Sequence, residues 1–475
     1  MEKNDIKQKI DEVLLKCSDP ILYSNILKDF FTNGIDKPSK SLESLNILPK
    51  INDKVLKKKF EDNKNKICDY IKNKITKNLS IYPVLSCIFG SFVGDAVGAF
   101  CEFHKCSKNN YKKIFKDKPV FGQTPGQVTD DSEMAMCCAY AIMDNPEKNK
   151  IDPNYLYFYY GAWSQSHPID IGTTTRKAFI DFDFHKFNPK NNNFNQIENQ
   201  IFSNNKNSLS NGFLMRKSTL ITWIYYRFYK EINCAFSSIN DNTCLLELYK
   251  KVKEISNIDN KCSHPRLENS IISAFYIIMA LGAIKQLRAS NIIDKIYNLC
   301  KDKYFMNNGE EESKVANFII VYIDIIKDNN FDFWNFFGNK TSDDYVNKNI
   351  GWYGHSFKLT LYYLINFEYI DEKNRFKIIL DEICNLGGDT DTNACIVGGV
   401  IGPLIGFKNF GVYFDKVHNL IPHDRYLFST FIMVLYVQYL KNSNRNNKLI
   451  QNDKYFLKVI LSLLYDDIEI EIDYE

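Results

Sequence analysis

The 475-residue sequence predicts a mostly α-helical protein whose loops carry the chemistry. Long stretches place apolar residues at helical spacing, whereas alternating β-branched runs bounded by turn pairs are rare. Hydrophobic residues make up 45% and charged residues 25% of the chain, which excludes the disordered, collagen-like and disulfide-miniprotein classes. The expected helices cover 216–234, 268–288, 314–328, 355–369, 374–386 and 425–441.

The composition changes along the chain and indicates three parts. Residues 1–80 are rich in Lys and Asn with sparse apolar anchors at helical spacing, which predicts a helical N-terminal extension. Small residues, glycines and continuous apolar stretches follow, so we place the main, catalytic domain at 81–445 and a tail or final helix at 446–475. Within the main domain, the Asn-rich segment 182–207 is expected to be a mobile loop.

Charge and cysteine usage bear on partners and compartment. The formal net charge of +3 gives no electrostatic reason to expect nucleic acid or a membrane as a partner, and it permits a monomer. The apolar runs are shorter than the roughly 18 residues that suggest a membrane span. The 13 cysteines lack the paired spacing of a zinc site, and the first ten residues contain no apolar signal segment. We expect cysteines that are mostly small buried hydrophobic residues, and a cytoplasmic or nuclear location.

Three glycines at intervals of four residues, Gly90, Gly94 and Gly98, fall on one face of a predicted helix. Their small size lets the backbone of another element approach closely. No Gly-Lys-Ser/Thr follows, so this is not a phosphate-binding P-loop. From spacing alone, Asp95 is interpreted as a buried structural hydrogen-bonding residue. Glu102 is interpreted as a solvated charge at a helix end, with a carboxylate at the site as the alternative.

Two acidic clusters combine carboxylates with hydroxyl groups, and both precede or open apolar helices. They are TDDS at 129–132 and GGDTDT at 387–392. Helix capping explains either cluster taken alone, because Asp and Thr are good N-caps. Two clusters of the same chemistry favour a shared site for Mg²⁺, Mn²⁺ or Ca²⁺, since carboxylate and hydroxyl oxygens are hard ligands. The glycines before Asp389 supply the backbone freedom for a sharp turn.

Six motifs together resemble the ADP-ribosylglycohydrolase family, in the family's order and over roughly 81–410. They are GDAVG with the following Glu102 and Phe103, TDDS, DIGTTTR at 170–176, SNGFLMR at 210–216, SHP at 263–265 and GGDTDTNA at 387–394. The resemblance implies an all-α orthogonal multi-helix bundle with two Mg²⁺ ions in a cleft, Mn²⁺ being the alternative ion.

The resemblance also implies roles for individual residues. The implied metal ligands are Thr129, Asp130, Asp131, Asp389, Asp391 and Thr392. The implied catalytic carboxylates are Glu102, Asp131 and Asp389. The residues expected to line the ADP-ribose cleft are Gly172, Thr173, Ser210, Asn211, Gly212, His264 and Tyr353.

The implied activity is hydrolysis of the glycosidic bond between ADP-ribose and a protein side chain or small acceptor. The partner is then an ADP-ribosylated protein or a small molecule that contains ADP-ribose. Two other functions stay open: a non-hydrolytic relative that binds ADP-ribose or serves structurally, and a metal-dependent phosphoester or pyrophosphate hydrolase. Pro403 and the 182–207 segment depart from the family pattern and leave substrate preference open. The hydrolase interpretation requires that the two acidic clusters, roughly 260 positions apart, meet in one pocket.

Overall fold

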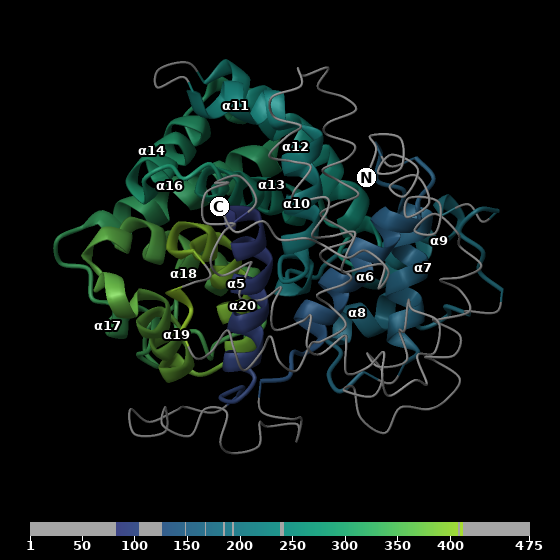
Figure 1. Ribbon diagram of the computed structural model, residues 1–475, viewed down its shortest axis with the longest axis horizontal. Coiled ribbons are helices and arrows are strands. Elements are labelled where there is room, and N and C mark those ends of the chain that lie inside the picture. Colours follow the sequence, from purple (N-terminus) through teal and green to yellow (C-terminus); the bar gives the residue numbers. More distant parts are fainter. Residues whose placement is uncertain are drawn as a thin grey trace, which may run out of the picture.

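The structure, a computed structural model, describes residues 82–103 and 126–411, apart from 148, 167, 184–185, 192–193, 238–241 and 407–408. These described residues form helices joined by loops, with no strand among them (Figure 1). An isolated antiparallel bridge joins Ser210 to Trp352. The prediction of an all-α helical bundle is therefore confirmed. The expected extension at 1–80, the expected tail at 446–475 and the expected helix at 425–441 lie outside the described residues.

The described helices follow one another along the chain with short connections. The α-helices are α5 (Tyr82–Gly98), α6 (Asp130–Asp144), α7 (Pro153–Ser164), α8 (Thr173–Ala178), α9 (Asn195–Asn205), α10 (Lys217–Arg227), α11 (Tyr229–Ser237), α12 (Thr243–Lys261), α13 (Leu267–Ile284), α14 (Ala289–Cys300), α15 (Lys303–Asn307), α16 (Glu310–Lys327), α17 (Phe333–Phe337), α18 (Tyr353–Ile365), α19 (Arg375–Leu386) and α20 (Thr390–Ile405). Three short 3₁₀ helices are η3 (Asn211–Phe213), η4 (Phe367–Tyr369) and η5 (Glu372–Asn374).

Helices α5 and α20 lie side by side in the middle of the bundle and are antiparallel (Figure 1). The predicted glycine face of α5 makes this close approach. A Cβ atom added at Gly94 would lie 2.2 Å from the carbonyl oxygen of Ala394 on α20. The expectation that these glycines admit another backbone is confirmed. The pairing brings the C-terminal end of α5 next to the N-terminal end of α20, where the second acidic cluster lies.

Helix α13 forms another part of the core. It is long and apolar enough to cross a membrane by length and composition, but 94% of its 18-residue window is buried in the protein. Its buried side chains run all round the helix, from Glu268 to Ile284. A helix that is apolar on every side is expected in the centre of a large domain.

Two expectations about local structure differ from the fold. The single helix expected at 216–234 is two helices, α10 and α11, separated at Phe228. The 182–207 segment is not wholly a loop, because it contains α9. Its apolar side chains explain this: Phe194 and Ile201 are 2% and 1% exposed and pack into the core. Asn-rich composition concealed these two anchors.

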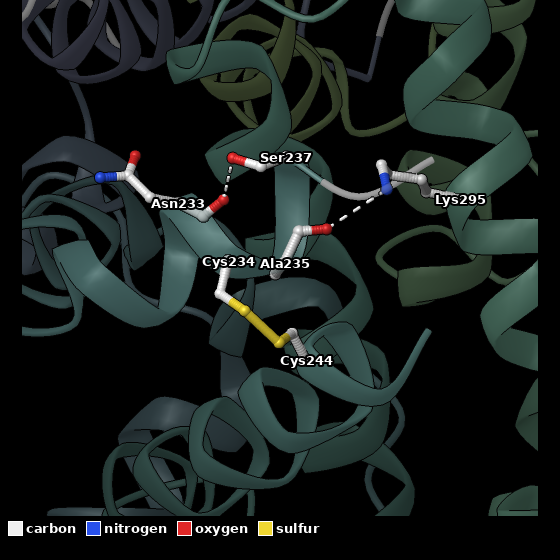
Figure 2. The surroundings of a disulfide bond; sticks show 6 residues. All are labelled: Asn233, Cys234, Ala235, Ser237, Cys244 and Lys295. Atoms are coloured by element: carbon white, nitrogen blue, oxygen red, sulfur yellow. Dashed lines mark hydrogen bonds between the residues drawn. A yellow bond between two sulfur atoms is a disulfide. The ribbon is translucent and has the colours of Figure 1, made fainter. Parts of the chain in front are cut away.

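The cysteines mostly follow the expectation. The free cysteines of the described residues are buried except for the half-buried Cys137. Cys234 and Cys244 differ, since they form a disulfide between α11 and α12 with Cα atoms 5.9 Å apart (Figure 2). Next to it, Lys295 donates a hydrogen bond to the carbonyl oxygen of Ala235 (Figure 2). Cys234 is exposed, so the interpretation as a buried hydrophobic residue is wrong for this pair.

Candidate active site

Asp95, on the last turn but one of α5, holds the first acidic cluster in place. Its carboxylate accepts hydrogen bonds from the backbone N–H of Thr129 at 3.0 Å and from the Thr129 hydroxyl at 2.8 Å. It also accepts from the Ser132 hydroxyl at 2.6 Å. The interpretation of Asp95 as a buried hydrogen-bonding residue is confirmed, and its bonds fix the start of α6 against α5.

The two acidic clusters meet, as the hydrolase interpretation requires. The hydroxyl of Thr392 lies 3.5 Å from Oδ2 of Asp131, although 261 positions separate them in the chain. Carboxylate oxygens of Asp95, Asp131 and Asp391 all lie within 4.8 Å of one another. All three residues are at most 1% exposed. A buried group of hard oxygen atoms therefore forms where α5, α6 and α20 come together.

A second group of carboxylates adjoins the first and shares one member with it. Oxygens of Glu102, Asp170 and Asp391 lie within 4.8 Å of one another. Glu102 is 1% exposed, so the interpretation as a solvated helix-end charge is wrong and the alternative of a carboxylate at the site is the one that fits. The sequence-based assignment missed Asp170. The signal was available, because Asp170 is the first residue of the DIGTTTR motif.

Burial and mutual repulsion shift the pKa values of these carboxyl groups upward. Burial raises the pKa of Asp95 to about 6. For Glu102, burial and then the charges of Asp389 and Asp170 raise the pKa to about 8. The pKa values of Asp131 and Asp391 are also well above their ordinary values, first because of burial and then because of neighbouring carboxylates. Without positive charge among them, these groups cannot all be ionised at neutral pH.

Helix capping does not account for the clusters. Thr129 and Asp389 occupy the N-cap positions of α6 and α20, but neither side chain accepts a capping hydrogen bond. Gly387 and Gly388 both have positive φ angles, 73° and 81°, so the sharp turn expected before Asp389 is present. The capping alternative is wrong at these two positions, and the turn directs the acidic side chains toward the other cluster.

Asp130 and Asp389, two further predicted ligands, lie near the cluster but outside the two close groups. Asp130 is buried, and burial followed by the charge of Asp170 raises its pKa well above the ordinary value. Asp389 is half-buried, and its Oδ2 accepts a 2.7 Å hydrogen bond from the Asn211 side chain. This bond joins the second acidic cluster to the predicted substrate segment.

The remaining residues of that segment form a polar network. The Ser210 hydroxyl lies 2.9 Å from Nε2 of His264, and Nδ1 of His264 lies 2.8 Å from the Ser263 hydroxyl. Gly212 faces the same imidazole, since a Cβ atom added there would lie 3.1 Å from Cε1 of His264. Burial lowers the pKa of His264 well below its ordinary value, so the ring is neutral. The structure thus brings together three of the residues expected in the cleft.

The other predicted cleft residues lie differently. Gly172 and Thr173 are exposed at the start of α8, two and three residues after Asp170. Nothing lies within 4 Å of a Cβ atom added at Gly172, so space is open there. Tyr353 is 3% exposed, and its hydroxyl donates a 2.6 Å hydrogen bond to Glu268, away from the carboxylate cluster. Whether these residues bind substrate stays a prediction.

Comparison with known proteins agrees with this arrangement. The sequence profile of the ADP-ribosylglycohydrolase family matches residues 82–419, which is most of the chain. A protein of Acanthamoeba polyphaga mimivirus, whose name gives it a provisional ADP-ribosyl glycohydrolase function, is 27% identical over 351 residues. That alignment covers 71% of this chain and 92% of the viral protein.

Two further similarities are more limited in extent or identity. The ADP-ribosyl dinitrogen reductase glycohydrolase of Rhodospirillum rubrum is 30% identical over 98 residues, covering 20% of this chain and 32% of that enzyme. A solved structure of an ADP-ribosylglycohydrolase-related protein complex aligns with 75% of this chain and 98% of its own, at 16% identity and a TM-score of 0.49.

Proposed function

Because the chain belongs to the ADP-ribosylglycohydrolase family, we propose that it hydrolyses the glycosidic bond between ADP-ribose and an acceptor and that it needs divalent cations to do so. One observation carries the proposal. Carboxylates from four separate segments, represented by Asp95, Asp131, Asp170 and Asp391, meet in a single buried cluster. Such a cluster is costly to build unless function requires it.

The residues present fit a hard divalent cation. Oδ1 of Asp131 is buried and has no hydrogen-bond donor among the described residues. The neighbouring oxygens come from carboxylates and from the hydroxyls of Thr129 and Thr392, which is the donor set that suits Mg²⁺ or Mn²⁺. We infer that Asp131, Asp391 and Thr392 hold one ion and that Asp130 and Asp389 complete a pair of sites. A bound ion supplies the positive charge that lets the carboxylates ionise and that polarises oxygen ligands.

Glu102 is the residue best suited to move a proton. Its raised pKa of about 8 leaves it protonated at neutral pH, and Asp170 beside it contributes to that shift. A protonated carboxyl group can donate to the leaving atom as the glycosidic bond breaks, the role of the general acid in glycoside hydrolysis. Asp389, held by Asn211, is then in position to accept a proton from the attacking water. Positive charge that develops on the ribose ring is offset by the surrounding carboxylates.

The substrate side of the proposal follows the polar segments. Ser210 and His264 supply hydrogen-bonding groups beside the cluster, and the exposed backbone at Gly172 and Thr173 offers N–H groups for the diphosphate. The proposed partner is an ADP-ribosylated protein or a small molecule such as O-acetyl-ADP-ribose. We further propose that the protein acts as a monomer in the cytoplasm or nucleus.

The test is product analysis with defined substrates. Purified full-length protein with Mg²⁺ is incubated with arginine-linked and serine-linked ADP-ribosylated peptides and with O-acetyl-ADP-ribose, and the products are identified by mass spectrometry. Release of free ADP-ribose supports the proposal and names the acceptor. Release of AMP instead indicates pyrophosphate cleavage. Calorimetric binding of ADP-ribose without any turnover indicates a non-hydrolytic binding protein, and either result overturns the proposal.

A further inference from the structure

The loop at 344–352, between α17 and α18, spans the two halves of the site. On one side, the Asn347 side chain donates a 3.0 Å hydrogen bond to the carbonyl oxygen of Leu386, just before the second acidic cluster. On the other, the carbonyl oxygen of Gly351 accepts a 2.7 Å hydrogen bond from the backbone N–H of Asn211. The loop therefore contacts both the segment that carries Asp389 and the segment that holds it.

Two side chains of α18 anchor this loop from below. Nε2 of His355 lies 2.7 Å from the carbonyl oxygen of Lys348. A carbonyl oxygen only accepts, so Nε2 carries the hydrogen. One turn further along, the ammonium of Lys358 pairs with Asp344 and lies 4.4 Å from the centre of the Trp352 ring. Both side chains are buried, at 2% and 0% exposure.

From the His355 anchor, a short series of hydrogen bonds leads to the acidic cluster. Just beyond the anchored carbonyl, Asn349 and Gly351 adopt left-handed backbone angles, with φ of 56° and 83°, so the chain turns sharply. Gly351 then accepts from the Asn211 backbone, and the Asn211 side chain donates to Asp389. Freeing the loop at its anchor removes the support beneath each later bond.

We propose that His355 is a positioning residue of the hydrolase site, because its Nε2–H fixes the 344–352 loop and thereby the Asn211 side chain that holds Asp389. The proposal rests on the proposed function of this site. Burial lowers the pKa of His355 to about 4, so the ring is neutral and keeps the donor on Nε2 throughout the neutral range. The ring also packs edge-on against Trp352, with centroids 5.2 Å apart. A purely structural histidine would act through that packing alone.

A pair of substitutions separates the donor from the packing. His355→Phe keeps a ring and removes the donor, whereas His355→Gln removes the ring and keeps an amide N–H at the place of Nε2. We expect kcat for ADP-ribose release at saturating Mg²⁺ to fall about tenfold in His355→Phe, since small misplacements of reacting groups cost up to about 100-fold. In His355→Gln we expect kcat within about threefold of the parent. Thr360→Val is the matched control, because that buried hydroxyl of the same helix bonds only to the Ser356 carbonyl.

Hydrogen exchange measured by mass spectrometry supplies a readout that does not depend on turnover. We expect faster exchange in peptides covering 345–352 and 209–213 in His355→Phe, and unchanged exchange in His355→Gln and Thr360→Val. Should His355→Phe fail to fold, His355→Asn replaces it, because its shorter amide cannot reach the Lys348 carbonyl. Unchanged exchange in the donor-free variant, or equal loss of kcat in the Gln variant, overturns the proposal. A parent protein that releases no ADP-ribose refutes the proposed function, while the exchange data still decide the anchor.

Discussion

Replacing Gly98 with alanine is expected to push the two acidic clusters apart. The added methyl carbon would lie 2.3 Å from the carbonyl oxygen of Thr390 and 2.4 Å from Cα of Asp391. Both are backbone atoms at the start of α20, so neither can rotate away. The same change at Gly90 meets the carbonyl oxygen of Gly398, also at 2.3 Å. The two substitutions therefore make equal steric demands at different distances from the site.

The cost can be worked from this geometry. A carbon and an oxygen in normal contact are more than 3 Å apart, so the helices must separate by about 1 Å. Overpacking of this kind costs about 3 kcal/mol, and alanine regains about 1 kcal/mol in helix propensity over glycine. The net loss is about 2 kcal/mol, or roughly 3 °C in Tm for a domain of this size. Both variants should show it.

Only Gly98→Ala should affect the site. Gly90 lies two turns further along α5, about 12 Å away, whereas Gly98 touches the residue that joins both carboxylate groups. We expect Gly98→Ala to lose at least about tenfold in both Mn²⁺ affinity and kcat, the scale of a misplaced catalytic group. Gly90→Ala should keep parent activity when assayed well below its Tm. Thermal unfolding, calorimetric Mn²⁺ titration and the ADP-ribose release assay test this. Parent-like metal binding in Gly98→Ala would refute the reasoning.

Three further predictions concern charges in the fold. Asp389→Ala and Asp131→Asn should each abolish ADP-ribose release while the far-UV circular dichroism stays helical; turnover in either variant contradicts the assigned roles. Chelation with EDTA should stop the reaction and added Mg²⁺ or Mn²⁺ should restore it, measured by product mass. Burial alone would raise the pKa of Asp259, but Arg216 and Lys217 outweigh it and lower the pKa to about 2. Asp259 should therefore contribute about 2 kcal/mol of stability above pH 5, lost as the pH falls toward 2. Urea unfolding at several pH values should show this loss in the parent and its absence in Asp259→Asn.

The sequence allowed the helical class and the meeting of the two acidic clusters to be predicted, because both depend on local pattern. The spacing of Gly90, Gly94 and Gly98 indicated a face for close backbone contact, and α20 occupies it. Which element would lie there was not readable from composition. The partner is set by the long-range fit of whole helices, and only the family resemblance pointed to a common pocket.

Burial was the property that the sequence conveyed least well. Glu102 follows a helix end and was interpreted from spacing as solvated, yet the turn at Phe103 returns the chain to the Gly388 carbonyl and keeps the carboxyl group inside. Asp170 stands in a motif that was recognised, but its neighbours gave no sign that its side chain meets Glu102. Whether a carboxyl group is enclosed depends on elements far away in the chain.

The domain contains two buried ionic groups with opposite solutions to the same problem. Asp259 is 1% exposed and is paired with the guanidinium of Arg216 at 3.3 Å and with Lys217. Asp131 is as deeply buried, yet its closest charged neighbours are other carboxylates, and its pKa is raised where that of Asp259 is lowered. The chain supplies cations to one cluster and withholds them from the other. Since a buried charge without compensation is strongly unfavourable, the cluster around Asp131 is the one built to take its positive charge from outside the chain.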